Sequence, residues 1–516
     1  MSPKKTLKKS GFNTEKYLKF QERAIEKRLT KFKDKLYLEI GGKLYGDFHA
    51  ARTLPGYAPD TKLLLLKRLR KNLEIVFCIS AKQLSSGKTR GDLGISYDLA
   101  TVVALEGLRK FGFSVRAVVI NRFAKELEAE VLKKRLQRKG YQVYLRYEIE
   151  GYPENLDLVL SKEGYGEDNY IETKKPLVVV WGTGPGSGKF STCLGQIYHD
   201  QKRGLDSGYA KFETFPIWNL PLEHPVNLAY EASTADLGDF NLVDPYHLAT
   251  YKKVAVNYNR DVESFPILVG LIQKFDNQKK FIAHYRSPTD MGVNMMKKGI
   301  VDEEIVSRAA KREIIFYLFR YRQEYFKGLV DKKTLDKIGL LLKRAGVSED
   351  GLPTVPAARR ARKKAEKDRK KGERGIYCGA AIELKNGKII TGKNSPLLHA
   401  EAACILNAVK VLARIPDSID LLSSQAIESF KEIKGKVLKE ESKSLELNEV
   451  LVALAISEAT NPTVKKTLEK LSELKGCYLH TTHRPSAGDE TIFRKLGLWV
   501  STDGLVSKEP PGPLVN

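Results

Sequence analysis

An apolar strand that runs into a glycine-rich turn and then into a helix constrains the fold of this chain more than any other feature. Residues 177–181 read LVVVW, a β-branched run typical of a buried strand. Four of the next seven residues, 182–188, are glycine, and Lys189 follows at the start of a predicted helix. This order suits a phosphate group, because glycines let backbone N–H groups approach, the helix N-terminus favours an anion and the lysine adds positive charge.

The turn departs from the P-loop pattern at two positions. The pattern has a glycine five positions before the Gly-Lys pair, where this chain has Thr183, and a Ser or Thr directly after the lysine, where it has Phe190. A bare tight turn is the alternative, but such a turn has no use for Lys189. We therefore expect a nucleotide or another phosphate ligand. The residues predicted to bind it are Gly182, Gly184, Gly186, Ser187, Gly188 and Lys189.

The sequence around the turn predicts an α/β fold. Strand-like runs at 35–40, 74–80, 115–120, 142–147, 157–161 and 177–181 alternate with helical patterns at 14–33, 60–72, 97–112, 124–139 and 189–203. Apolar runs spaced by amphipathic helices indicate a mostly parallel sheet with flanking helices. Ligands of such sheets bind beyond the carboxyl ends of the strands, where the glycine turn would lie.

The remainder of the chain predicts polar loops and a smaller C-terminal α+β domain. We expect long polar and aromatic loops from about 205 to 295, and a hairpin whose strands flank Asn386-Gly387. Further helices are expected at 302–346, 399–413, 424–440, 446–459 and 462–474. The predicted divisions are an α/β P-loop-like domain at 1–300, a helical extension at 301–350, a basic linker at 351–375 and a C-terminal domain at 376–516.

The formal net charge of +25 raises the question of a nucleic-acid partner. Basic residues are concentrated in one segment, 359–374, which contains no aromatic side chain that could stack on bases. A solvated basic helix or linker is therefore favoured over a nucleic-acid site, and charge-driven binding of nucleic acid stays as an alternative.

The five cysteines are odd in number, widely scattered and without C-x-x-C spacing. This pattern suggests neither a disulfide framework nor a zinc knuckle. The sequence also has no secretion signal and no run near the roughly 20 apolar residues that a membrane span needs. We expect a cytoplasmic protein with no membrane partner.

Dense polar and aromatic residues in 211–247 and nearby predict the substrate region. A carboxylate opposite a bound triphosphate would hold Mg²⁺ or activate an acceptor, and an arginine would neutralise transferred charge. The catalytic candidates, besides Lys189, are Arg260, Asp236, Asp244 and Asp290. The alternative is that such residues satisfy buried loop backbone.

Two further candidates follow the strand at 74–80, at the same predicted edge of the sheet. Arg90 could contact a phosphate, and Asp92 a metal ion or a ribose hydroxyl. A salt-bridged turn is the alternative for this pair.

A histidine–glutamate pair near the second domain resembles a zinc deaminase motif. His399 and Glu401 form H-x-E, which in that class is completed by a later P-C-x-x-C string. The sequence contains no such string, so we do not expect deaminase chemistry. His480 and His483 form H-x-x-H, a weak signal that we interpret as polar loop histidines.

Several long strings of this chain resemble a bacterial family described only as "domain of unknown function 1846". They include KLYLEIGGKLYGDFHAARTLPGY at 35–57, RGDLGISYD at 90–98, GPGSGK at 184–189, VNYNRDVESFP at 256–266 and SPTDMGVN at 287–294. The resemblance runs from about residue 12 to about residue 505 and implies no known reaction.

The resemblance adds one candidate metal ligand. The family's loop is similar to an apolar strand followed by G-P-G-S-G-K, two residues and a threonine, which is Thr192 here. It therefore implies Thr192 as the ligand of a phosphate-bound Mg²⁺. The order of Lys189, one intervening residue and then the hydroxyl residues Ser191 and Thr192 also resembles the loop of ATP-dependent ligases of the formate–tetrahydrofolate ligase type.

Together these features predict an enzyme that binds ATP or another nucleoside triphosphate with Mg²⁺ through residues 182–192. It would transfer a phosphoryl group to, or ligate, a small polar or phosphorylated acceptor held by 208–295. One alternative is a non-hydrolysing sensor of a nucleotide or phosphorylated metabolite, supported by the missing hydroxyl after the lysine. The other is a charge-driven nucleic-acid binder. A C-terminal domain that forms a homo-oligomer is compatible with all three.

Overall fold

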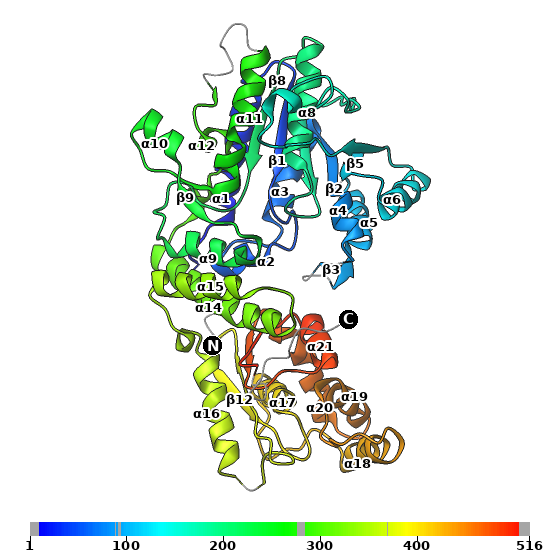
Figure 1. Cartoon of the computed structure of the whole chain (residues 1–516). Coiled ribbons are helices and arrows are strands. Elements are labelled where there is room, and N and C mark those ends of the chain that lie inside the picture. Colours follow the sequence, from blue (N-terminus) through cyan, green and yellow to red (C-terminus); the bar gives the residue numbers. More distant parts are fainter. Residues whose placement is uncertain (1–9, 88, 91–93, 276–283, 369, 505–516) are drawn as a thin grey trace. The chain divides into compact units, whose positions relative to one another are not determined.

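The computed structural model describes residues 10–87, 89–90, 94–275, 284–368 and 370–504. The chain forms two compact units, Met1–Ala310 and Lys311–Asn516, coloured from blue to red along the chain in Figure 1. The first contains a parallel sheet with helices, and the second contains a smaller mixed sheet with helices. The predicted fold class, an α/β domain with a smaller α+β domain, is confirmed.

The first unit is built on six parallel strands in the order β6-β5-β2-β7-β1-β8. The strands are β1 (Lys35–Ile40), β2 (Leu73–Ser80), β5 (Val115–Phe123), β6 (Val143–Tyr147), β7 (Leu177–Gly182) and β8 (Ser207–Phe212). Every residue of β1, β2 and β7 is buried, as expected for strands covered on both faces. The strand that leads into the glycine turn, β7, thus lies in the middle of the sheet.

Helices flank this sheet (Figure 1). The predicted helices correspond to α1 (Thr14–Leu29), α3 (Thr61–Arg68), α5 (Tyr97–Lys110), α6 (Leu127–Arg138) and α8 (Lys189–Lys202). Shorter elements are α2 (Phe48–Thr53), α4 (Ala81–Ser85) and the small ribbon of β3 (Thr89–Arg90) and β4 (Ile95–Ser96). Helix α8 begins directly after the glycine turn and packs on β7, β1 and β8.

The strand predicted at 157–161 is wrong, because residues Leu156–Val159 form the short helix α7. The side chain of Asn155 accepts the backbone N–H of Leu158 and so caps this helix. A short apolar run cannot be assigned to strand or helix from its pattern alone, and here the cap decides.

The long loops predicted for 205–295 are also wrong. The segment contains β8, α9 (Pro225–Ser233), β9 (Asn241–Val243), α10 (Pro245–Tyr251), β10 (Val256–Tyr258), α11 (Asn259–Phe275) and α12 (Pro288–Met291), and α13 (Met296–Gly299) follows. The side chains of His224, Asp244 and Ser287 each cap one of these helices. Capping residues have the same polar composition as loops, which explains the error.

The second unit has a four-stranded sheet in the order β12-β11-β13-β14. Its strands are β11 (Gly379–Glu383), β12 (Ile389–Lys393), β13 (Tyr478–Thr481) and β14 (Trp499–Thr502). The predicted hairpin is confirmed: β11 and β12 pair antiparallel, and Gly387 has a φ of +85°.

Helices complete the second unit. They are α15 (Lys332–Ala345), α16 (Thr354–Glu366), α17 (Ala400–Ala413), α18 (Ser424–Glu432), α19 (Leu447–Glu458), α20 (Pro462–Lys470) and α21 (Ala487–Leu496), while α14 (Glu303–Phe326) crosses the division between the units. Among the described residues no helix is long and apolar enough to span a membrane.

The segment predicted as a basic linker, 351–375, contains the packed helix α16. Ala357 and Ala358 of this helix pack against Ala381 of β11. A Cβ on Gly379 of β11 would lie 2.3 Å from the Ala358 carbonyl oxygen, so the two backbones are in close contact. The helix is packed because alanines interrupt its run of basic residues and form a buried face.

Candidate functional site at the glycine turn

The glycine turn lies where the connections of the parallel sheet change direction. The chain leaves β2 and returns at its neighbour β5, whereas it leaves β7 through α8 and returns on the other side, at β8. Since β2 and β7 are adjacent, their carboxyl ends flank a topological switch point. Ligands of open α/β sheets bind in this place.

The conformation of the turn requires glycine at three positions. Gly186 and Gly188 have φ values of +72° and +81°, in the left-handed region. A Cβ on Gly182 would lie 2.2 Å from the Cys78 carbonyl oxygen, and one on Gly188 would lie 2.5 Å from Asn121 Cγ. Gly184 differs, because a Cβ there would meet nothing within 4 Å. Packing therefore does not require glycine at this position, and the open space beside it would let a ligand approach the backbone.

Side chains of neighbouring elements hold the turn from outside. The Thr183 hydroxyl donates to Gln83 Oε1 at 3.0 Å, and Gln83 Nε2 donates to the Pro185 carbonyl oxygen at 2.9 Å. Asn121 Nδ2 donates to the Ser187 carbonyl oxygen at 2.9 Å. In the described part of the chain, the backbone N–H groups of 184, 186 and 188 have no acceptor. The turn is thus fixed while its own donors stay unused.

The Lys189 side chain folds back into the turn. Its Nζ lies 3.2 Å from the Gly184 carbonyl oxygen and 3.5 Å from Ser187 Oγ. It also lies 3.9 Å from Glu39 Oε1, and the side chain is only 10% exposed. The ammonium group therefore stands between the turn and a carboxylate of the neighbouring strand β1.

Phe190, which replaces the hydroxyl residue of the P-loop pattern, and Thr192, the predicted metal ligand, both have structural contacts. The ring of Phe190 stands edge-on to that of Tyr209, with centroids 5.2 Å apart. Thr192 is fully buried, and its Oγ1 lies 2.9 Å from the Gly188 carbonyl oxygen and 3.2 Å from Asn121 Oδ1. The hydroxyl is occupied in closing the turn, so Thr192 would have to change rotamer to bind a metal ion. Its role as a ligand stays a prediction.

A group of charged residues adjoins Lys189, and we call it the acidic–lysine cluster: Glu39, Lys211, Glu213 and Asp261. Glu39 and Asp261 are buried, and the side chains of Lys211 and Glu213 are 11% and 20% exposed. Glu39 and Lys211 are register partners in the neighbouring strands β1 and β8. Lys211 Nζ pairs with Asp261 and lies 3.1 Å from Glu213 Oε1. Tyr209 completes the cluster by donating its hydroxyl to Glu39 Oε2 at 2.7 Å.

Burial changes the proton affinities in this cluster. It raises the pKa of Glu213 to about 7; Lys211 opposes this shift, and Asp261 and Glu39 add to it. Burial likewise raises the pKa of Asp261. For Lys211 burial lowers the pKa, but Asp261, Glu213 and Glu39 outweigh it, so that the net pKa is raised. The ammonium group is stable here, and Glu213 can exchange a proton near neutral pH.

Sequence reasoning missed the acidic–lysine cluster as a unit. Lys211 and Glu213 fall in the predicted substrate region, but they were not among the predicted catalytic residues. A usable signal was present in β1, where Glu39 interrupts the otherwise uncharged buried run at 36–40. A charge inside such a strand needs partners, and they come from distant segments: Lys189 lies 3.9 Å away, and Lys211 is the register neighbour in β8.

Two predicted catalytic carboxylates have structural partners. Asp244 is fully buried, caps α10, and accepts the backbone N–H and the hydroxyl of Thr289 at 2.9 and 2.6 Å. Asp290 accepts the hydroxyl of Tyr251 at 2.9 Å and the backbone N–H of Arg286 at 3.0 Å. None of these contacts joins either carboxylate to Lys189. Their catalytic roles stay predictions.

The other predicted residues lie apart or outside the description. Arg260 Nε pairs with Asp239 at 2.6 Å, and its side chain is 42% exposed. Asp236 is exposed in the short 3₁₀ turn before β9. Arg90 belongs to β3, but its side chain is not described, and Asp92 lies outside the described residues.

Carboxylates compensate part of the basic segment 359–374. Arg359 Nη2 donates to Asp503 and to Glu349, both at 2.6 Å. Arg362 Nε lies 3.2 Å from Glu366. These pairs support the interpretation of the segment as a structural helix.

The histidines of the second unit separate into two environments. His480 is fully buried, with Nδ1 2.8 Å from Ser501 Oγ and Nε2 3.4 Å from Asp503. His483 instead pairs with Glu401, its Nε2 lying 3.1 Å from Oε2. Glu401 outweighs burial and raises the pKa of His483 to about 10, whereas burial and Glu401 together raise the pKa of Asp489 to about 8.

The comparisons with known proteins cover nearly the whole chain. A family model described as "Domain of unknown function DUF1846, N-terminal" matches residues 10–346, and its C-terminal counterpart matches residues 353–509. A UPF0371 protein of Clostridium tetani is 45% identical over 495 residues, or 96% of this chain and 97% of that protein. One of Fusobacterium nucleatum is 43% identical over 503 residues, or 97% and 99% of the two chains. The resemblance inferred from the sequence strings is confirmed, and these descriptions name no ligand or reaction.

Proposed function

Because this chain belongs to the DUF1846 family, whose description names no reaction, we propose a function from the geometry of the glycine turn. The first unit is a cytoplasmic enzyme that binds ATP or another nucleoside triphosphate with Mg²⁺ at residues 182–192. It transfers a phosphoryl group to, or ligates, a small polar or phosphorylated acceptor. The observation that carries the proposal is a fixed turn at the switch point with unused N–H donors and the Lys189 ammonium group beside them.

The hydrogen-bonding capacity of the backbone N–H groups and of the Lys189 ammonium group supports phosphate binding. Backbone N–H groups at the start of α8 gain charge-assisted hydrogen bonds from an anion, and the helix dipole adds to them. Lys189 now donates to a neutral carbonyl oxygen at 3.2 Å. A phosphate oxygen is a stronger acceptor for an ammonium group, so an anion in the turn would replace that carbonyl.

The acidic–lysine cluster supports an enzyme rather than a simple binder. Glu213, with a pKa of about 7, can take the proton of an acceptor hydroxyl or amine at neutral pH. Lys211 would then balance negative charge that develops during transfer. Lys189 connects the glycine turn with the acidic–lysine cluster, because its ammonium group lies close to both Gly184 of the turn and Glu39 of the cluster.

A non-hydrolysing sensor is the second candidate, and a specific observation favours it. The hydroxyl of Thr192 is engaged with the turn, so no hydroxyl stands ready in the usual place to hold Mg²⁺. Turnover assays with the purified full chain, nucleotide and Mg²⁺ separate the candidates. Release of product from a nucleotide supports the enzyme, and saturable binding without any product supports the sensor.

The ligand itself can be identified without choosing a substrate in advance. Denaturing the purified protein and analysing the released small molecules by mass spectrometry should yield a nucleotide or phosphorylated metabolite. The same preparation of Lys189→Ala should contain less of it. Equal amounts in both preparations would contradict binding at the turn. We also propose that the second unit forms a homo-oligomer. This would not change the outcome of the test, because the released ligand is measured per chain.

A further inference from the structure

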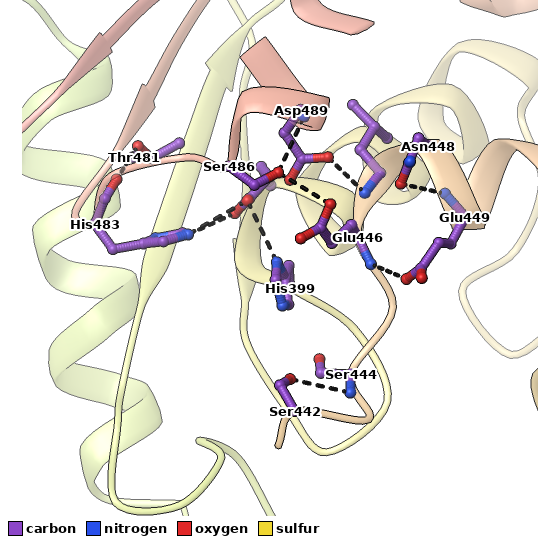
Figure 2. A network of polar contacts seen from close by, with 12 residues as sticks. His399, Ser442, Ser444, Glu446, Asn448, Glu449, Thr481, His483, Ser486 and Asp489 are labelled. Carbon is purple, nitrogen blue, oxygen red and sulfur yellow. Dashed lines mark hydrogen bonds and ion pairs between the residues drawn. The ribbon is translucent and has the colours of Figure 1, made fainter. Parts of the chain in front are cut away.

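A compact polar cluster in the second unit lies outside the site described above. His399 precedes α17 as its N-cap, Glu401 lies in the first turn of that helix, and Asp489 lies in the first turn of α21. One ligand atom from each of the three lies within 4.8 Å of the others. Figure 2 shows His399, His483 and Asp489 approaching one region from separate segments.

Two carboxylates of this cluster are buried and two imidazoles are partly exposed. We call Glu401 and Asp489 its floor, and His399 and His483 its rim. Glu401 and Asp489 are fully buried, whereas the side chains of His399 and His483 are 25% and 24% exposed. Solvent therefore reaches the imidazoles but not the carboxylates. An ion could enter past the two rings and still be held by buried oxygen atoms.

The hydrogen bonds of the floor are incomplete. Asp489 Oδ1 accepts the Leu447 backbone N–H at 2.9 Å, but among the described residues nothing donates to the buried Oδ2. The group that interacts with it is the second carboxylate, Glu401. His483 and His399 both face Glu401, at 3.1 and 3.8 Å, and among the described residues neither imidazole forms an ion pair with Asp489. A second buried carboxylate needs a shared proton or a cation.

We propose that His399, Glu401 and Asp489 bind one divalent transition-metal ion, with His483 turning from Glu401 to serve as a fourth ligand. Imidazole nitrogens combined with carboxylate oxygens suit Zn²⁺ or Mn²⁺, whereas Mg²⁺ and Ca²⁺ prefer oxygens alone. Bonds of about 2.1 Å place ligands roughly 3.4 Å apart around a tetrahedral ion. Because the ligand atoms already lie within 4.8 Å of one another, small side-chain rotations would bring them to that spacing.

The surrounding contacts resemble an outer shell that orients ligands. The Leu447 N–H fixes Asp489, and the Ser486 hydroxyl, the cap of α21, donates to Glu446 at 3.0 Å (Figure 2). The arrangement is not that of the zinc deaminases. Cys404, close to Glu401 in sequence, points its sulfur to the Ile390 carbonyl oxygen at 3.4 Å, so this thiol is directed away from the three ligands.

Calorimetric titration of the untagged full chain with Zn²⁺, after removal of metal by a chelator and without nucleotide, tests the site. We expect one tight equivalent per chain. Asp489→Asn keeps the oxygen that accepts the Leu447 N–H but removes the charge, and should weaken this binding at least tenfold, as should Glu401→Gln. Glu432→Gln, which neutralises an exposed carboxylate of α18 that pairs with Lys436, should leave the affinity unchanged.

Co²⁺ offers a spectroscopic control, because a four-coordinate Co²⁺ site with nitrogen and oxygen ligands absorbs in the visible range. The bands should appear in the wild type and be lost in Asp489→Asn. If circular dichroism shows that Asp489→Asn is unfolded, His399→Ala, at the partly exposed rim, replaces it in the test. The visible Co²⁺ bands of His399→Ala should then be weaker than those of the wild type. No stoichiometric Zn²⁺ binding by the wild type, or equal binding by the folded variants, would overturn the proposal.

Discussion

Lys189 has three neighbours that together explain why a lysine follows the glycines. Its ammonium group lies near the carbonyl oxygen of Gly184, the hydroxyl of Ser187 and the carboxylate of Glu39. The contact with Gly184 keeps the charge inside the turn when no anion is bound. The carboxylate offsets the cost of burying that charge. In the proposed function, only this side chain has to move for its ammonium group to meet a phosphate oxygen.

Glycine-to-alanine changes in the turn should separate folding from binding. Gly188→Ala places a Cβ at a φ of +81° and 2.5 Å from Asn121 Cγ, so we expect a loss of about 1–3 kcal/mol in the free energy of unfolding. Gly184→Ala meets open space and should leave stability unchanged while weakening nucleotide binding. Urea denaturation and calorimetry measure the two effects. Equal stability of both variants would contradict the described turn.

Glu213 should make stability depend on pH in a defined window. Its pKa is raised from 4.5 to about 7, so between these values the folded state keeps a proton that the unfolded state loses. The contribution of Glu213 to stability is therefore fully present below about pH 4.5 and falls as the pH rises to about 7, by at most about 3 kcal/mol.

Comparison with Glu213→Gln isolates this effect, because glutamine has the same shape but does not titrate. The difference in unfolding free energy between the two proteins, measured by urea denaturation at several pH values, should change between pH 4.5 and 7 in favour of the variant. A difference that stays constant through this window would show that Glu213 titrates normally.

At the scale of helices and strands, the sequence predicts best those strands in which every residue is buried. β1 and β7 are runs of buried residues that end at a glycine turn, and their predicted bounds agree with the structure to within one residue. The prediction fails for α7 and for 205–295, where caps such as Asn155 and Asp244 decide the structure. The glycine turn was predictable because all its residues are contiguous.

The acidic–lysine cluster was not predictable, because it depends on strand order. Glu39 and Lys211 become neighbours only when β8 pairs with β1, and no local pattern determines that pairing. The same holds for His399 and Asp489, which belong to the starts of two different helices. Long-range neighbours of this kind require the assembled structure.

The packing of α16 on β11 gives a prediction at the scale of the element. Gly379→Ala would place a Cβ 2.3 Å from the Ala358 carbonyl oxygen and 2.5 Å from the Arg362 backbone nitrogen. Because both neighbours are backbone atoms, the helix must move, at a cost of about 1–3 kcal/mol. Gly387→Ala is not a suitable control, because its φ is positive, so Gly339→Ala on α15, which meets nothing within 4 Å, serves instead.

Thermal unfolding followed by circular dichroism measures this difference. We expect a lower melting temperature for Gly379→Ala and no decrease for Gly339→Ala. If 351–375 were an unpacked linker, the two variants would melt at the same temperature.

For the whole molecule, the net charge of +25 is the property that no single site explains. Three arginines of the basic segment, Arg359, Arg362 and Arg374, pair with carboxylates, and further lysines and arginines are spread along the whole sequence. Such a distribution attracts polyanions without recognising them.

Binding of nucleic acid should accordingly be weak and strongly dependent on salt. In a filter-binding series with a single DNA oligonucleotide, affinity should fall by orders of magnitude between low and physiological salt. Lys189→Ala should bind the DNA as the wild type does. Tight binding that persists at physiological salt would favour the nucleic-acid alternative over the nucleotide site.

The most direct test of the central claim is calorimetric titration of the full chain with ATP and Mg²⁺, repeated with GTP. The account predicts one saturable site per chain for at least one nucleotide, and at least tenfold weaker binding by Lys189→Ala. Lys110→Ala removes the same charge from the exposed end of α5 and should bind as the wild type does. Absence of binding to the wild type, or equal affinity in a folded Lys189→Ala protein, would contradict it.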